Sequence, residues 1–198
     1  MYLYLDTTED LNIGLYDENY KALKFLDIKS KKTSLILQST LFELLKEKNL
    51  EVKDLQGIIY CAGPGSYTGM RVGQGFVDIC QWQKIPVYSF YHFKVPKILN
   101  IQSGSWIASA FKGETFIYKW NGDENSTELV KDETLKLEEL GDNIFTRGEM
   151  AGQEKIKSTQ ILIRENDSFL FKYIVENKIK EELFYYRPLE LEFKVPNA

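Results

Sequence analysis

The sequence predicts an α/β protein with two lobes, on three observations. The chain has 198 residues, more than the ~100–150 of a typical domain but less than twice that number. Strand and helix patterns alternate through its first half, and shorter strand-like runs occupy the second half. Hydrophobic residues make up 43% and charged residues 27%, which is an ordinary globular composition. We place the lobe boundary in the polar stretch 102–105, which gives lobes of 1–103 and 104–198.

The N-terminal part predicts an antiparallel meander followed by a helix. Strand patterns at 2–5, 13–16 and 23–28 are separated by Asp, Thr, Glu and Asn, which favour turns. From 33 to 48 the apolar spacing becomes helical. The main apolar stripe of this helix consists of Leu37, Leu41, Leu44 and Leu45.

This helix carries more apolar surface than one buried face requires, because Leu35, Ile36 and Phe42 extend its stripe. A compact apolar run at 57–61 predicts a central strand, and a glycine-rich loop follows it directly. Helical spacing then continues to about residue 83, and Pro86 ends that element before a short strand. The predicted order of the first half is therefore β-β-β-α-β-α-β.

The second half predicts a smaller α/β lobe. Strand-like runs occur at 106–110, 115–120 and 161–163, and a helical pattern at 167–178 precedes the tail. The stretch 91–100 stays ambiguous, because a proline interrupts what would otherwise be a helix. Turn-forming residues between the second and third runs predict a loop at that point.

Charge and hydropathy exclude several classes of protein. The net charge of −4 disfavours autonomous nucleic-acid binding, because phosphate neutralisation needs clustered Lys and Arg. No window holds the ~20 apolar residues of a membrane span, and the N-terminus lacks a secretory pattern. We therefore expect a cytoplasmic protein that does not contact membranes. Cys61 and Cys80 lie in apolar patterns and are expected to be buried, reduced thiols.

The motif GPGSYTGMRVG at 63–73 is the most informative segment. Its glycines permit close backbone approach, its proline fixes the turn, and its hydroxyls can cap the following helix. Backbone N–H groups at such a helix N-terminus can bind phosphate, although the same composition also builds a plain tight turn. Neither a Walker-type Lys-Ser/Thr nor a GxGxxG pattern is present. A vestigial phosphate loop here would comprise Asp6, Thr7, Gly63, Gly65, Ser66 and Thr68.

The helix after this loop carries small residues on one face of its first turns. Gly69 and Gly73 lie one turn apart, beside Val72 and Phe76. Small residues let another backbone approach closely, either from the sheet of the same chain or from a partner. Both uses stay open, because a helix offers several faces.

Three segments resemble the TsaB (YeaZ) family: LYLDTT at 3–8, GPGSYTGMRVG after an apolar strand, and YYRP at 185–188. The resemblance covers the first half well and the second half through scattered features. It implies an actin-like, ribonuclease-H-like (ASKHA) bilobed fold in which the first lobe is complete and the second is reduced.

The resemblance also implies a function. Members of this family are non-catalytic subunits that bind TsaD, the enzyme that makes threonylcarbamoyladenosine in tRNA, and help to recruit the ATPase TsaE. The implied heterodimer forms through the helices at 33–48 and 69–83, and a homodimer can use the same region, while contact with tRNA is indirect. The implied interface residues are Leu37, Leu41, Leu44, Leu45, Gly69, Val72, Gly73 and Phe76.

We expect no catalytic residue, no metal site and no cofactor. TsaD-like catalysis uses a metal held by two histidines, whereas this chain has only His92, for which a packed structural role is expected. Asp6 occupies the position where actin-like kinases hold phosphate and Mg²⁺. The alternative function is therefore a small actin-like nucleotide-binding protein or kinase that uses Asp6 and the 63–69 loop. A third alternative is a stand-alone homodimer that acts outside the modification pathway.

Overall fold

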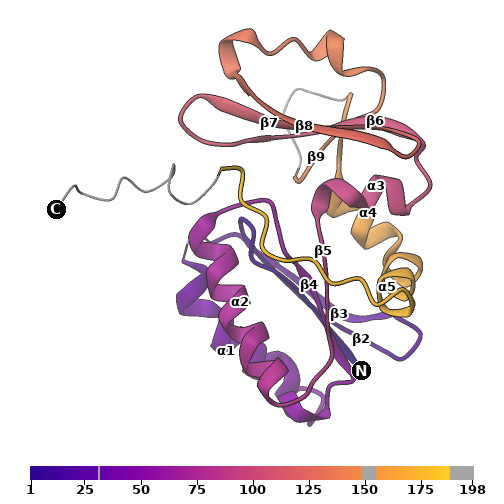
Figure 1. Cartoon of the computed structure of the whole chain (residues 1–198). Coiled ribbons are helices and arrows are strands. Elements are labelled where there is room, and N and C mark those ends of the chain that lie inside the picture. Colours follow the sequence, from indigo (N-terminus) through magenta and orange to yellow (C-terminus); the bar gives the residue numbers. More distant parts are fainter. Residues whose placement is uncertain (31, 149–154, 188–198) are drawn as a thin grey trace, which may run out of the picture.

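The computed structural model describes residues 1–30, 32–148 and 155–187, which form two five-stranded sheets with helices around the first (Figure 1). The predicted α/β architecture with two lobes is confirmed. Pro188, the last residue of the YYRP motif, lies outside the described residues. Within the described ranges, no helix is long and apolar enough to cross a membrane.

The first sheet combines the predicted antiparallel meander with two parallel strands, in the order β3-β2-β1-β4-β5. β1 pairs antiparallel with β2, and β2 pairs antiparallel with β3. β1 also pairs in parallel with β4, and β4 with β5. The five strands span Tyr2–Asp6, Leu11–Tyr16, Ala22–Ile28, Gly57–Cys61 and Val87–Phe90.

Helices α1 (Thr33–Lys46) and α2 (Tyr67–Trp82) cover one face of this sheet (Figure 1). Side chains at alternate positions of β1 point to this face and pack with the leucine stripe of α1. The N-terminus of α2 is capped by Ser66, whose hydroxyl accepts a hydrogen bond from the Gly69 N–H. This cap explains why the helix begins before the position expected from apolar spacing.

Helix α5 (Asp167–Glu176) packs on the opposite face of the same sheet, although it comes late in the sequence (Figure 1). Phe171 stacks on Tyr4 of β1, with ring centroids 5.2 Å apart. The chain after α5 runs beside β5, where the Ser89 N–H donates to the Ile179 carbonyl oxygen at 3.0 Å. The C-terminal part of the chain therefore helps to enclose the first sheet, while the lobe boundary itself stays a prediction.

The second sheet repeats the topology of the first, in the order β10-β9-β6-β7-β8. β6 and β7 pair antiparallel, as do β7 and β8, whereas β6 and β9 pair in parallel, as do β9 and β10. Among the described residues, the chain between β8 and β9 forms short 3₁₀ turns in place of a helix. The five strands span Ser103–Ser109, Glu114–Asn121, Glu124–Lys131, Ile144–Thr146 and Ile156–Ser158.

The strand predicted at 161–163 is wrong. These residues lie in α4 (Thr159–Glu165), where the hydroxyl of the N-cap Ser158 accepts a hydrogen bond from the Ile161 N–H. Three consecutive apolar residues fit either a strand or one turn of a helix, and of these three only Ile163 is buried. The helical cap, which the pattern did not reveal, decides the outcome.

Two other segments show what apolar patterns cannot resolve. The predicted loop between β7 and β8 is a tight hairpin at Gly122, and β8 was missed because its side chains are polar and mostly exposed. The ambiguous stretch 91–100 contains a 3₁₀ turn at His92–Lys94 and the short helix α3 (Val95–Ile98). Pro96 is accommodated because it lies in the first turn of α3, where no backbone N–H is required.

Substitution of Gly73 tests how closely α2 packs on the first sheet. A Cβ at Gly73 would overlap Thr7 Oγ1 and approach Tyr60 Cε2 to 2.8 Å, whereas a Cβ at Gly75 would meet nothing within 4 Å. We expect Gly73→Ala to have a free energy of unfolding about 1–3 kcal/mol lower than that of Gly75→Ala. Gly75→Ala should be neutral or stabilising by up to ~1 kcal/mol, because Ala favours a helix. Equal denaturant midpoints for the two variants would contradict this packing.

Candidate functional site

The C-terminal ends of β1, β4 and β5 meet at one edge of the first sheet. Asp6 ends β1, Cys61 ends β4, and His92 follows β5 after one residue. The glycine-rich loop leaves the same edge, directly after β4. Because ligands of open α/β sheets bind outside the carboxyl ends of the strands, this edge is the candidate functional site.

The glycine-rich loop packs directly on the chain that follows β1. The Ser66 N–H donates to the Thr8 carbonyl oxygen. A Cβ at Gly65 would overlap the Thr8 backbone, and a Cβ at Gly69 would overlap the Thr7 carbonyl oxygen. These glycines therefore have an intramolecular purpose, since any larger residue would push the loop off the sheet edge.

The six residues predicted for a vestigial phosphate loop differ in accessibility. Thr68 is exposed and Ser66 is half-buried. The other four are buried in contacts within the chain: Asp6, Thr7, Gly63 and Gly65. Phosphate binding at this loop stays a prediction, and it would require these contacts to open.

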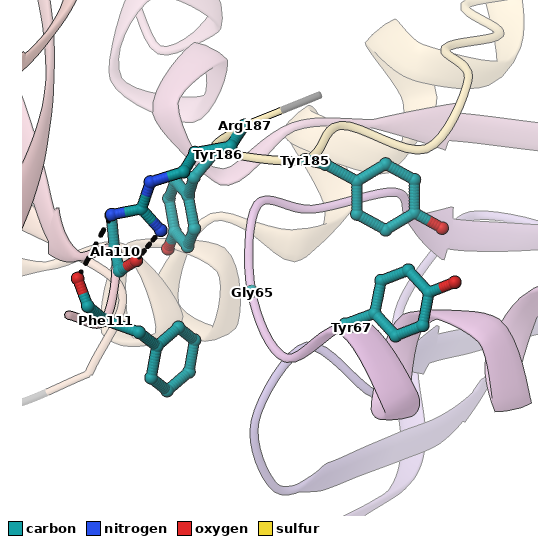
Figure 2. A pocket seen from close by; sticks show the side chains of 7 residues that line it. All are labelled: Gly65, Tyr67, Ala110, Phe111, Tyr185, Tyr186 and Arg187. Atoms are coloured by element: carbon teal, nitrogen blue, oxygen red, sulfur yellow. Dashed lines mark hydrogen bonds between the residues drawn. The ribbon is translucent and has the colours of Figure 1, made fainter. Parts of the chain in front are cut away.

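A narrow cleft lies between the loop and the second lobe (Figure 2). Tyr67 and Tyr185 pair on one side of it, with ring centroids 5.3 Å apart. On the other side, Arg187 donates to the carbonyl oxygens of Ala110 at 2.6 Å and Phe111 at 3.2 Å. The cleft has a volume of about 40 Å³, far below the ~300–1,000 Å³ of small-molecule pockets. In this conformation it does not have room for a nucleotide.

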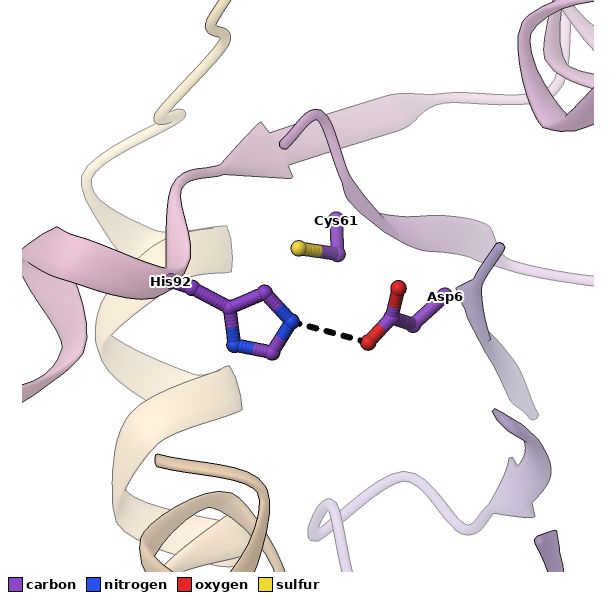
Figure 3. A group of neighbouring side chains, drawn as sticks. All are labelled: Asp6, Cys61 and His92. Atoms are coloured by element: carbon purple, nitrogen blue, oxygen red, sulfur yellow. Dashed lines mark hydrogen bonds and ion pairs between the residues drawn. The ribbon is translucent and has the colours of Figure 1, made fainter. Parts of the chain in front are cut away.

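Asp6, Cys61 and His92 form a buried cluster at the strand ends (Figure 3). One potential ligand atom from each residue lies within 4.8 Å of the other two. His92 Nε2 is 2.9 Å from Asp6 Oδ2. Asp6 Oδ1 accepts hydrogen bonds from the backbone N–H of Thr8 at 2.8 Å and from its hydroxyl at 2.6 Å. Both oxygens of a carboxylate that has no contact with water are thus hydrogen-bonded, as its burial requires.

The environment keeps Asp6 ionised and Cys61 protonated. Burial alone would raise the pKa of Asp6, but the adjacent His92 and the hydrogen bonds from His92 and Thr8 outweigh it, so the pKa is lowered from 3.8. Because an ionised carboxylate can only accept, His92 Nε2 donates to it. Burial, and secondarily the Asp6 charge, raises the pKa of the Cys61 thiol well above its ordinary value. The cluster therefore combines a carboxylate, an imidazole and a neutral thiol.

His92 also connects the two lobes. Its Nδ1 lies 3.2 Å from the hydroxyl oxygen of Thr159 at the start of α4. Trp106 of β6 lies nearly parallel to the imidazole, at 15° and with ring centroids 6.5 Å apart. Nearby, Arg147 donates to the Thr8 carbonyl oxygen at 3.0 Å. His92 is thus packed at the junction of the lobes, and its role stays a prediction.

Most residues predicted for a partner interface are turned into the core. The α1 leucines are almost fully buried, and Gly69 and Gly73 face Thr7 on the sheet side of α2. Only Val72 and Phe76 of the predicted set are half-buried. Side chains that form the core cannot contact a partner, so the predicted set has to be corrected to the exposed residues of the same helices. The buried leucines are Leu37, Leu41, Leu44 and Leu45.

Both helices expose large apolar side chains on their outer sides. On α1, Leu35 is 71% and Phe42 is 65% exposed, and on α2, Ile79 is 52% and Trp82 is 89% exposed. We call these four residues the outer apolar surface. A groove of about 620 Å³ adjoins it, with Phe42 and Phe76 among its lining residues. The wide apolar arc in the sequence of α1 is thus divided between a core face and an outer face.

Sequence patterns missed the buried cluster, because its three members are far apart in the chain. A signal was nevertheless available. Asp6, Cys61 and His92 each lie at or just after the end of a predicted strand, and parallel strands bring such ends together. Taken singly, none of the three residues indicates a site.

Asp6→Asn tests how much the buried hydrogen bonds stabilise the fold. Asn has the same size, but one of its two terminal groups only donates, so a donor from His92 or Thr8 loses its acceptor. We expect the free energy of unfolding at neutral pH to fall by about 1–3 kcal/mol in chemical denaturation. Asp142→Asn, at an exposed position, is the control and should stay within ~0.5 kcal/mol of the unmodified protein. Equal effects of the two substitutions on the free energy of unfolding would refute a stabilising role for the hydrogen bonds of Asp6.

Comparison with known proteins finds a family that is similar to part of the chain. The family model of TsaD, described as tRNA N6-adenosine threonylcarbamoyltransferase, matches residues 27–95. This stretch contains α1, β4, the glycine-rich loop, α2 and β5. No curated protein matches the chain.

Two solved structures are similar over nearly the whole chain. One is described as an uncharacterized protein with similarity to peptidase YEAZ from Pseudomonas aeruginosa. Its TM-score is 0.62 at 18% sequence identity, and the match covers 94% of this chain and 99% of that chain. The other is YeaZ from Pseudomonas aeruginosa, with a TM-score of 0.58 at 18% sequence identity. The match covers 92% of this chain and 99% of that chain. These matches, with the repeated sheet topology, confirm the actin-like bilobed fold class. The chain is therefore similar in fold to YeaZ over nearly its whole length, and residues 27–95 are similar to the TsaD family.

Proposed function

We propose that this chain is a non-catalytic, cytoplasmic subunit that binds a TsaD-type protein and supports threonylcarbamoylation of adenosine in tRNA. The observation that carries the proposal is the outer apolar surface on α1 and α2. The match to the TsaD family and the likeness to YeaZ support a partner of the TsaD kind. The surface lies within the matched stretch, so the region most similar to the family is also the region fitted for docking.

The apolar composition of this surface favours association. Burying one exposed Leu, Ile or Phe side chain contributes roughly 1.5–3 kcal/mol. Trp82, at the C-terminal end of α2, is 89% exposed, and aromatic anchors of this kind dominate the energetics of protein interfaces. The adjoining groove beside Phe42 and Phe76 can receive a side chain from a partner. Together these features suit a specific interface better than a solvent-exposed face.

The core faces of the same helices give the surface its rigidity. The leucines of α1 and the glycines of α2 fix both helices on the first sheet, so their outer side chains are held in place before binding. A preorganised subunit can stabilise one conformation of its partner by binding that conformation more tightly. In this proposal the subunit acts on TsaD by such differential binding. TsaE and tRNA are engaged through the complex, in keeping with a net charge of −4.

Features of the strand-end site support a non-catalytic role. Both oxygens of Asp6 are engaged by Thr8 and His92, and the neighbouring cleft is small. A kinase would need room beside this carboxylate for hydrated Mg²⁺ and phosphates, and a cleft of about 40 Å³ does not provide it. The alternative function, a small actin-like nucleotide-binding protein or kinase, would therefore require the lobes to open.

Nucleotide binding separates the two functions. We expect no saturable binding of ATP with Mg²⁺ to the isolated chain by isothermal titration calorimetry, because no described cavity at the strand ends admits it. Saturable binding that Asp6→Asn abolishes, while Asp142→Asn retains it, would favour the kinase alternative.

The partner interface is tested by co-purification with TsaD from the same source. Phe42→Glu, Ile79→Glu and Trp82→Glu each place a charge on the outer apolar surface without touching the core. We expect each to weaken the affinity for TsaD at least tenfold. The free-energy cost of burying an unpaired charge exceeds the ~1.4 kcal/mol that corresponds to a tenfold change in affinity. Circular dichroism should show that the variants remain folded.

The matched control is Phe169→Glu, which alters a 51% exposed phenylalanine on α5, against the opposite face of the sheet. It should bind TsaD as well as the unmodified protein does. If the unmodified chain fails to associate with TsaD and modification of tRNA proceeds without it, the proposal is refuted. The same surface would instead belong to a homodimer if the unmodified chain self-associates, does not bind TsaD, and loses self-association in the Trp82 variant.

A further inference from the structure

The buried cluster at the strand ends has the composition of a metal site. Asp6, Cys61 and His92 offer a carboxylate oxygen, a thiol sulfur and an imidazole nitrogen, all within 4.8 Å of one another. Each of the three residues is 0% exposed. Figure 3 shows the His92 imidazole and the Asp6 carboxylate facing each other, with the Cys61 side chain beside them, at the ends of β1 and β4 and in the turn after β5. The sequence led us to expect no metal site, because His92 has no second ligand near it in the chain.

We propose that Asp6, Cys61 and His92 bind one divalent transition-metal ion of the zinc class. Zinc is of intermediate softness and takes thiolate, imidazole and carboxylate ligands together, whereas Mg²⁺ and Ca²⁺ take oxygen ligands. Three protein ligands with a fourth position for a small molecule or water is a common zinc arrangement. The inference is independent of the proposed function, since it concerns the core of the first lobe and not the outer apolar surface.

The spacing of the ligand atoms fits such an ion after a small adjustment. Metal–ligand bonds of about 2.0–2.3 Å at tetrahedral angles place ligand atoms roughly 3.3–3.8 Å apart. His92 Nε2 and Asp6 Oδ2 are 2.9 Å apart and would separate slightly. Cys61 Sγ is 3.9 Å from the Gly63 carbonyl oxygen, a weak hydrogen bond that coordination of the sulfur would replace.

The groups around His92 favour a cation at Nε2. Thr159 donates its hydroxyl proton to the Thr146 carbonyl oxygen at 3.0 Å, which leaves its oxygen to accept from His92 Nδ1 at 3.2 Å. Asp6 likewise presents an acceptor to Nε2. An imidazole between two acceptors needs a proton on both nitrogens, or a proton on Nδ1 and a metal ion on Nε2. The second arrangement is the one in which metal-bound histidines are usually found, with the outer nitrogen donating to a neighbouring oxygen.

Binding would also resolve the charges of the cluster. The Cys61 thiol would release its proton to solvent as the sulfur coordinates, and the carboxylate of Asp6 would coordinate without a change in protonation. The resulting thiolate and carboxylate neutralise the two positive charges of the ion, so the buried site has no net charge. Thr8, which donates to Asp6 Oδ1 through its backbone and hydroxyl, would orient the carboxylate.

The test measures metal content and the identity of the ligands in the full chain. Because the ligands are buried, the protein is produced in zinc-supplemented medium and, separately, refolded from guanidinium with one equivalent of Zn²⁺ or Co²⁺. After desalting, we expect about one metal ion per chain by mass spectrometry. The Co²⁺ form should show the near-ultraviolet charge-transfer absorption of a thiolate ligand.

Cys61→Ser and His92→Gln should each lower the metal affinity at least tenfold, measured by competition with a chromophoric chelator. Cys80→Ser is the matched control, since Cys80 is also a buried cysteine but lies on α2 outside the cluster. It should retain the metal and the thiolate absorption. Absence of stoichiometric metal from the unmodified protein in both preparations overturns the proposal, as does equal retention in the Cys61 and His92 variants. If a variant does not fold, the Co²⁺ form of the unmodified protein still tests the proposal. Bound cobalt without thiolate absorption would show that no cysteine is a ligand and would overturn the proposed site.

Discussion

The carboxylate of Asp6 is buried where three strand ends meet, and the arrangement of the surrounding structure depends on satisfying it. An ionised group without water requires a donor at each oxygen. Thr8 supplies the donors to Oδ1 by turning back immediately after β1, and His92 supplies the donor to Oδ2 from the turn after β5. The backbone of this turn at Thr8 is also the surface on which the glycine-rich loop packs. One charged group thus connects β1, the loop and the chain after β5.

The same group couples the lobes. His92 reaches Asp6 with one nitrogen and Thr159 with the other, so the hydrogen bonds run from the first sheet to the start of α4. The two sheets share one topology although the sequence contains no recognisable repeat. In the second, the described chain between β8 and β9 forms 3₁₀ turns in place of a helix, whereas the first is covered on both faces, by α1 and α2 and by α5. A reduced second lobe that contacts the strand ends closes the site instead of forming an open cleft.

Helices α1 and α2 each have two faces with different tasks. Their inner faces form the core with alternate residues of the sheet, and the glycines of α2 allow contact at backbone distance. Their outer faces carry the exposed side chains that we propose for docking. A protein whose strand-end site is filled by its own side chains can still act through such a surface. Under the proposed function, the chain acts through this outer surface and not through its cleft.

The sequence by itself determined the local elements of the first lobe and the family resemblance. Alternation and helical spacing are local properties, so the meander, the central strand and both helices were predicted with ends that differ by a few residues. The short run at 161–163 and the polar strand β8 were not, because their structure depends on a cap and on pairing with a neighbour. Only the tertiary structure decided which side of α1 faces the core, because Leu37 and Phe42 are equally apolar in the sequence. It likewise decided that Asp6, Cys61 and His92 meet, because parallel pairing of β1, β4 and β5 joins residues that local patterns treat separately.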